Sequence, residues 1–392
     1  MWPVRAKSKS AVDKPAVPVT APPAIWKKKA GLRGHLMGPA VLMRRLGTAF
    51  RARRTIRPAT MDLPTLSLVD PTIGGIGSEM AALALIRLLQ NNGYRPGILI
   101  VSSYVGVRHP IWADADNYAV KRVPAVAHLF AAQAPTLLSY RAAAVEAAFK
   151  EKNCDLVILF NPPPDAPFTV DLSIIVAESQ YGMGNFKQYP AGPMRLAVPA
   201  AFGSAQAVIL MGEGSGMMPV IYQASQHGIK RIQSRIRVPV SWERGQDDRR
   251  SRFGLRSRPV LLWSGQLRPD LTHVHLKHFR VKVAQLVRLS PTKLPTASDA
   301  RKLLERADKD KLELLCSELD AIRLRQTCAQ NPNPDLLALL ERSHQFPLLI
   351  KFEHPARMIA VLEQYLPSLV KPVPESAAAE LPQPTDPNVV TN

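Results

Sequence analysis

The stretch SLVDPTIGGIGSEM, Ser67–Met80, followed by the apolar run Ala81–Leu89, decides the fold of this chain. An apolar strand leads into a glycine-rich turn, and the turn opens a helix. This order places backbone N–H groups and a helix N-terminus where a phosphate can bind. A working phosphate-binding loop also carries a Lys after its last Gly, followed by Ser or Thr to hold Mg²⁺. Ser78 and Glu79 stand at those two positions.

The loop therefore keeps its shape and loses its charge. Two unit charges ~4 Å apart repel by about 4 kcal/mol at an effective dielectric near 20, so Glu79 opposes a bound phosphate. Two interpretations remain open: a strand–helix turn with no ligand, and a remnant nucleotide-binding loop. The remnant loop would consist of Gly74, Gly75, Gly77 and Ser78.

The strongest compositional feature of the 392 residues is a net charge of +20, with a pI near 10.1. This charge predicts a polyanionic partner, either a nucleic acid or an acidic membrane surface. It is concentrated in residues 1–60 and in a second cluster, 230–258. The residues predicted to contact RNA or a membrane are Lys27, Lys28, Lys29, Arg44, Arg45, Arg51, Arg53, Arg54, Arg249, Arg250, Arg252 and Arg256.

Cysteine usage and hydropathy exclude several classes of protein. The three cysteines are widely spaced and form neither a disulfide framework nor a zinc pattern, so we expect a reducing compartment and no disulfide-linked partner. No apolar run reaches the ~18 residues of a membrane span. We also expect no metal site.

The chain divides into four parts. Residues 1–60 form a basic extension in which 31–54 is typical of an amphipathic helix, lying on an anionic membrane or packed on the protein body. Residues 61–238 alternate apolar strands with helices, which favours a parallel sheet covered on both faces, as in P-loop NTPases. An Arg-rich linker and a second, smaller α/β domain occupy 239–369, and 370–392 form a Pro-rich tail.

Two further groups of residues were candidates for chemistry. His273, His275 and His278 lie close together. His273 and His275, at positions i and i+2, could share one face of a strand and bind a metal, or the segment could form a polar, basic strand edge. Trp242 and Phe253 lie among the arginines of the second basic cluster, where they could stack on unpaired bases or belong to a solvated loop.

Several segments resemble, in order and spacing, the tetraacyldisaccharide 4′-kinase family, P-loop enzymes that phosphorylate the lipid A precursor. The most specific is GMGNFKQYPAGPMR, 182–195, which is similar to the family's GNG-x-x-x-PAGPLRE. LWSGQLRP, 262–269, resembles AFAGIGRP, and SELDAIRL, 317–324, resembles TEKDAVRL. The resemblance covers about residues 25–330.

The family's catalytic motifs are altered. Its GGTGKT loop corresponds to GGIGSE at 74–79, and its GDEP segment, with the expected base, to Pro124–Ala127. Its DDG-x-Q metal turn falls on Phe160–Pro164, and its DHH segment on Pro291–Lys293. Phosphoryl transfer depends on these charges. Four neighbouring carboxylates could substitute for them: Asp114, Asp116, Asp155 and Asp165.

The sequence thus predicts a protein that is not an enzyme: an inactive homologue, with no catalytic residues and no cofactor, acting as a structural subunit of a larger assembly. Its partners would be a large protein or ribonucleoprotein assembly with RNA or an anionic membrane. The basic extension favours a mitochondrial location, in a ribosome or membrane complex.

Two alternatives remain open. The first is an active kinase that phosphorylates a lipid A disaccharide precursor with ATP and Mg²⁺, at the cytoplasmic face of a bacterial inner membrane. The second is a regulator that binds the lipid precursor through Pro190–Arg195 without phosphorylating it.

Overall fold

The computed structural model describes residues 26, 37–43, 46–47, 58–74, 77–101, 110–120, 123–140, 142–238 and 258–369. All twelve basic residues predicted to contact RNA or a membrane lie outside these ranges, as do Gly75, Trp242 and Phe253. In the predicted N-terminal helix, helical backbone is described at 38–43 and 46–47.

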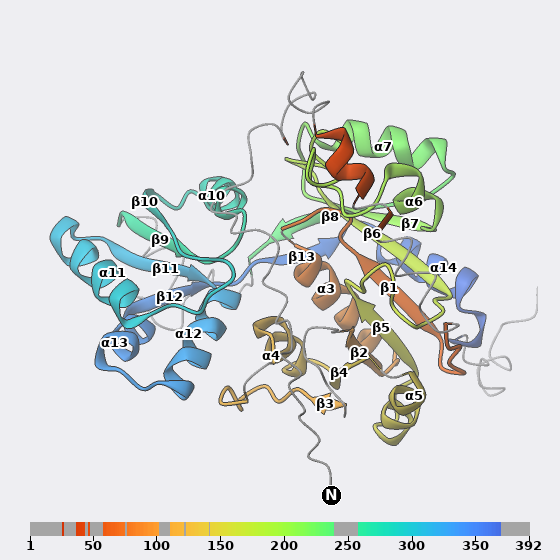
Figure 1. The fold of residues 1–392 in the computed structure, drawn as a ribbon, viewed down its shortest axis with the longest axis horizontal. Helices are drawn as coiled ribbons and strands as arrows, with labels where there is room; N and C mark the ends of the chain where they lie inside the picture. Colours follow the sequence, from red (N-terminus) through yellow and green to blue (C-terminus); the bar gives the residue numbers. More distant parts are fainter. Residues whose placement is uncertain are drawn as a thin grey trace, which may run out of the picture.

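A nine-stranded sheet forms the larger unit, with the order β13-β8-β7-β6-β1-β5-β2-β4-β3 (Figure 1). All neighbours are parallel except the outermost pairs, β13·β8 and β3·β4. The strands are β1 Thr65–Val69, β2 Pro96–Val101, β3 Ile111–Trp112, β4 Thr136–Ser139, β5 Leu156–Phe160, β6 Leu172–Glu178, β7 Ala207–Met211, β8 Lys230–Arg237 and β13 Leu349–Phe352.

Helices cover both faces of this sheet, as continuous apolar strands require. One face packs against α3 Ser78–Asn91, α4 Ala125–Ala131 and α14 Pro355–Tyr365, and the other against α5 Ala142–Glu151, α6 Val198–Gly203 and α7 Met217–Gln226. The short 3-10 helix η2, Pro367–Leu369, follows α14. The predicted parallel sheet flanked by helices is confirmed.

The smaller unit is a four-stranded parallel sheet with the order β10-β9-β11-β12. Its strands are β9 Val260–Ser264, β10 Val283–Arg288, β11 Glu313–Ser317 and β12 Ser343–Phe346. One face packs against α11 Ala297–Asp310, α12 Glu318–Gln330 and α13 Pro334–Arg342, and the other against α10 Pro269–His278.

The chain returns to the larger sheet after β12. Strand β13 pairs with β8, and α14 packs into the core of the larger unit, although the sequence suggested that both belong to the second domain. Lys230–Arg237, taken for part of a basic cluster, is strand β8: Ile232 and Ser234 are buried while its basic side chains are exposed. The domain boundary at 238 itself stays a prediction.

A buried carboxylate organises the turn after β9. Asp320, at the start of α12, is 1% exposed and accepts hydrogen bonds from the Ser264 hydroxyl (2.8 Å), the Gly265 N–H (2.9 Å) and the Ser317 hydroxyl (2.8 Å). Arg323, one turn later, donates to the carbonyl of Gly265 at 2.7 Å. Hydrogen bonds therefore fix both the N–H and the carbonyl group of Gly265, in the turn that follows β9.

We predict that Asp320→Ala lowers the free energy of unfolding by about 1–3 kcal/mol, because it leaves buried donors without an acceptor. Urea denaturation followed by circular dichroism measures the change. Glu363→Gln on the exposed face of α14 is the control and should leave stability within about 0.5 kcal/mol of the parent. Equal midpoints for both variants would contradict the role assigned to Asp320.

Candidate functional site

The glycine loop lies between the carboxyl end of β1 and the N-terminus of α3. Gly74 has a φ of 67°, and Gly77, which caps α3, has a φ of 110°. A Cβ on Gly74 would lie 2.6 Å from the Leu267 side chain of the smaller unit, and one on Gly77 would overlap the Met211 methyl. The loop thus needs glycine both for its backbone and for close packing.

Ser78, where the family loop carries Lys, is tied into the protein interior. It is 4% exposed, and its hydroxyl accepts a hydrogen bond from the Asn161 amide at 3.0 Å. The Asn161 carbonyl oxygen in turn accepts from the Asp70 N–H at 2.6 Å. The ends of β1, β5 and α3 are thereby joined by neutral groups. That Gly74, Gly77 and Ser78 bind a nucleotide stays a prediction.

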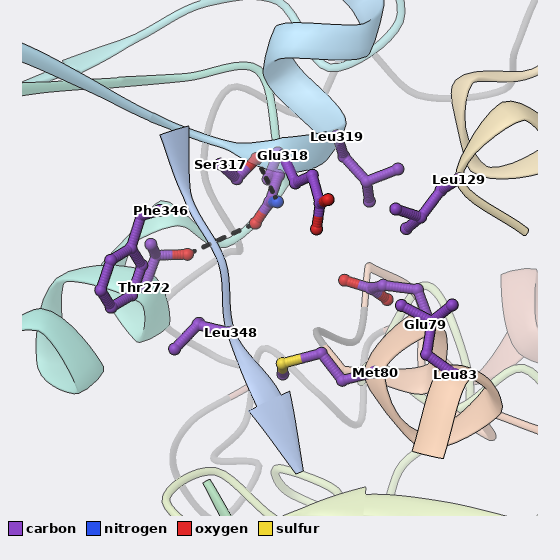
Figure 2. A pocket seen from close by; sticks show the side chains of 11 residues that line it. Glu79, Met80, Leu83, Leu129, Thr272, Ser317, Glu318, Leu319, Phe346 and Leu348 are labelled. Atoms are coloured by element: carbon purple, nitrogen blue, oxygen red, sulfur yellow. Dashed lines mark hydrogen bonds between the residues drawn. The ribbon is translucent and has the colours of Figure 1, made fainter. Parts of the chain in front are cut away.

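Glu79 lies at the N-terminus of α3, and its carboxylate accepts a hydrogen bond from the Gly77 N–H at 3.3 Å. Burial raises the pKa of Glu79, and nearby Asp70 raises it further. Figure 2 shows Glu79 facing Glu318 of α12. Both line a cavity of about 40 Å³ between the two units. Burial also raises the pKa of Glu318.

The smaller unit contributes Arg268 to a small pocket beside the glycine loop, which we call the crevice. Its guanidinium carbon lies 3.4 Å from the centre of the Tyr181 ring, and its side chain is only 4% exposed. One of its terminal nitrogens is 3.6 Å from an oxygen of Asp270. Asp70, Glu178 and Arg268 line the same small pocket. Arg268 belongs to the motif-like segment 262–269, so the sequence did contain a signal for it.

Two buried carboxyls balance this cation. Burial raises the pKa of Asp70 and of Glu178, while Arg268 partly offsets the shift in both. The Glu178 carboxylate accepts hydrogen bonds from the N–H groups of Gln180 (3.0 Å) and Tyr181 (2.9 Å). The crevice thus holds a charged arginine beside carboxyls that protonate more readily than usual.

Three buried polar atoms of residues near Glu178 and Arg268 have no hydrogen-bond partner among the described residues. They are Nε of Arg268, the hydroxyl of Tyr181 and Nε2 of His275. His275 Nε2 lies 3.9 Å from a Glu178 oxygen, and burial lowers the pKa of His275 to about 4, so the imidazole is neutral at pH 7. Buried polar groups are normally satisfied, so these atoms are among the exceptions in the described part of the chain.

The sequence analysis placed the histidines on a strand, but they lie on helix α10. On a helix, residues two apart do not share a face as they do on a strand. His275 is buried, His278 is exposed, and His273 is partly exposed. Among the described residues, no group of three or more His, Cys, Asp or Glu side chains is arranged to hold a metal ion.

Arg195 closes the PAGP-containing segment and lies on the loop. Its guanidinium donates to the carbonyls of Asp70 (3.4 Å) and Pro162 (3.3 Å), bridging the ends of β1 and β5. It also lowers the pKa of Asp70, against the larger effect of burial. The segment therefore supports the loop, whichever ligand binds there.

Of the four carboxylates proposed as substitutes, Asp155 is badly placed. Asp155 precedes β5 and pairs with Arg95 at 3.0 Å. Since β5 runs parallel to β1, Asp155 lies at the edge of the sheet opposite the glycine loop. The sequence analysis did not identify Glu178, which ends β6 at the same edge of the sheet as the glycine loop.

Known proteins resemble this chain over most of its length. The model of the tetraacyldisaccharide-1-P 4′-kinase family matches residues 35–365. A tetraacyldisaccharide 4′-kinase of Methylobacterium sp. (strain 4-46) is 27% identical over 320 residues, covering 81% of this chain and 93% of the relative. One of Chelativorans sp. (strain BNC1) is 29% identical over 308 residues, covering 78% and 85%.

A solved structure shares the fold. The crystal structure described as the "apo" form of LpxK from Aquifex aeolicus in complex with ATP is 15% identical, with a TM-score of 0.52, and the match covers 85% of this chain and 97% of that one.

Two predictions made from the sequence are wrong in light of these matches. The chain was expected not to be an enzyme, yet the family model and the curated relatives carry the name of a kinase. It was expected to need no cofactor, yet the solved relative is described in complex with ATP. The inference of inactivity rested on the altered loop, metal turn and base segment together, and it did not consider Arg268 as a source of positive charge.

We predict that Gly77→Ala destabilises the protein by about 1–3 kcal/mol, because a side chain is strained at this φ and overlaps Met211. Gly203→Ala is the matched control: an added Cβ there has nothing within 4 Å and no positive φ. Thermal unfolding should show a lower Tm for Gly77→Ala alone. A Tm equal to that of Gly203→Ala would show that the loop does not hold this geometry.

Proposed function

Since the chain belongs to the tetraacyldisaccharide-1-P 4′-kinase family, we propose that it is an ATP-dependent kinase acting on a tetraacyldisaccharide precursor of lipid A. The reaction would move the γ-phosphoryl group of ATP to the 4′-hydroxyl of the sugar. The family match over residues 35–365 supports the proposal, together with a small pocket in which Asp70 and Thr72, just before the glycine loop, meet Arg268 of the smaller unit.

The observation that carries the proposal is the buried guanidinium of Arg268. Phosphoryl transfer needs positive charge near the transferred group more than it needs covalent chemistry. A guanidinium always carries its charge and presents several donors to phosphate oxygens. With Ser78 neutral, Arg268 is the buried cation in the crevice, and its Nε has no partner among the described residues.

The other groups of the site fit a nucleotide in part. The N-terminus of α3 offers backbone donors, as in other phosphate-binding loops. Glu79 opposes an anion and already accepts the Gly77 N–H. Glu178, whose pKa is raised by burial, is the candidate acceptor for the proton of the sugar hydroxyl.

The proposed location is the cytoplasmic face of a bacterial inner membrane. The curated relatives named above are bacterial, and nothing supports the mitochondrial location expected from composition. Within the described residues, no helix is both long and apolar enough to cross a bilayer. Leu42, Met43 and Leu46 are 57%, 74% and 62% exposed, which suits a peripheral contact. In this proposal the basic N-terminal segment contacts anionic lipid rather than RNA or a protein assembly.

We predict that the purified chain transfers label from γ-³²P-ATP to tetraacyldisaccharide 1-phosphate in mixed micelles. Arg268→Gln should lower kcat/KM by about 10²–10³-fold, as expected for the loss of one electrostatic stabiliser. Arg301→Gln is the control, because Arg301 is 66% exposed on α11. Absence of transfer by the folded parent protein would overturn the proposed function.

We predict that Glu79→Gln binds Mg²⁺-ATP several-fold more tightly than the parent, because a buried carboxylate beside the loop is removed. The pKa of Glu79 is raised, so falling pH neutralises it. Parent affinity should therefore rise toward pH 6 more steeply than that of Glu79→Gln.

Isothermal titration calorimetry at several pH values tests this, with exposed Glu305→Gln as control. Equal pH slopes for the parent and Glu79→Gln would exclude Glu79 as the group that weakens binding.

A further inference from the structure

A second cavity lies away from the crevice, at the edge of the larger sheet. It has a volume of about 590 Å³ and lies between α7, β8 and α14. A volume of this size is within the ~300–1,000 Å³ range of small-molecule sites. None of its lining residues belongs to the glycine loop or to the smaller unit.

The cavity exists because β13 is shorter than β8. The two strands pair only from Ser234 to Arg237 of β8, and the last backbone bond runs from the Glu353 N–H to the Gln233 carbonyl at 3.0 Å. Beyond this point no described strand covers the outer edge of Lys230–Gln233. Backbone groups alternate sides along a strand, so those of Arg231 face the open edge.

The floor and the rim of the cavity differ in chemistry. Apolar side chains from three elements form one part of the lining: Leu210, Ile221, Ile229, Ile232, Ala360 and Val361. Basic or titratable groups form another: Lys230, Arg231, His354 and Arg357, all exposed. No carboxylate lines the cavity, and Gln233 and Gln364 complete it.

This combination selects one class of ligand. A free inorganic anion would bind to the basic side chains and leave the apolar side chains of the cavity exposed to water. A neutral apolar molecule would use the floor and leave the cations without a counter-charge. A molecule with an anionic head and an apolar chain uses both, since apolar burial and charge pairing add in such sites.

We propose that this cavity binds an anionic lipid, with its phosphate among Lys230, Arg231 and Arg357 and its acyl chain along the open edge of β8, between Ile221 and Ile229 on one face of the sheet and Val361 on the other. The site is separate from the crevice and does not depend on phosphoryl transfer. It gives the protein a second contact with a lipid, on the side where α7 and α14 flank the sheet edge (Figure 1).

Binding of n-dodecyl phosphate to the full chain, below its micelle concentration, tests the proposal by isothermal titration calorimetry. n-Dodecyl maltoside, with the same chain and a neutral head, and inorganic phosphate, with the head alone, are the two comparison probes. We expect saturable binding of dodecyl phosphate, at least about tenfold tighter than either comparison probe.

Variants locate the bound probe. Arg357→Glu reverses a charge in the first turn of α14, where a carboxylate suits the helix dipole, so the fold should be retained. It should weaken binding of dodecyl phosphate by about tenfold or more. Arg306→Glu, on the exposed face of α11, should not change it.

Three results would overturn the proposal. The first is parent-like binding by Arg357→Glu, and the second is phosphate binding as tightly as dodecyl phosphate, which would indicate a free-anion site. The third is loss of binding in Arg268→Gln with Arg357→Glu unaffected, which would place the probe in the crevice. The kinase assay bears on none of them.

Discussion

The buried carboxylate of Asp320 is the interaction on which the crevice depends. It receives the Gly265 N–H and the hydroxyls of Ser264 and Ser317, so the turn after β9 has one shape. That turn delivers Leu267 onto Gly74 and Arg268 onto the ring of Tyr181. A carboxylate without these donors would be costly to bury, and the donors without the carboxylate would be unsatisfied. The position of the buried Arg268 thus depends on a group in another element.

Much of the fold was readable from local patterns. The strands Thr65–Val69, Leu156–Phe160, Ala207–Met211 and Val260–Ser264 are each a short apolar run between polar turns, a pattern visible in the sequence. Gly93 follows α3 with a φ of 78°, and the Tyr94 N–H bonds back to the Leu89 carbonyl, as at many helix ends.

Other elements depended on partners that a local pattern does not reveal. Four of the eight residues of strand β8 are basic, and the segment was interpreted as a charged cluster, because only its pairing with β7 and β13 makes it a strand. The segment with His273 and His275 was read with period two, whereas Pro269 at the first turn begins a helix. The crevice was missed for a related reason, since Glu178, Arg268 and His275 meet only when two units pack together.

The return of the chain to the larger sheet has a mechanical consequence. The smaller unit leaves the sheet after β8 and rejoins it at β13, and these two strands are antiparallel neighbours. The chain therefore leaves the larger sheet for the smaller unit and returns to it at neighbouring positions of one edge. Rotation of the smaller unit about that edge would change the width of the space between α3 and α12.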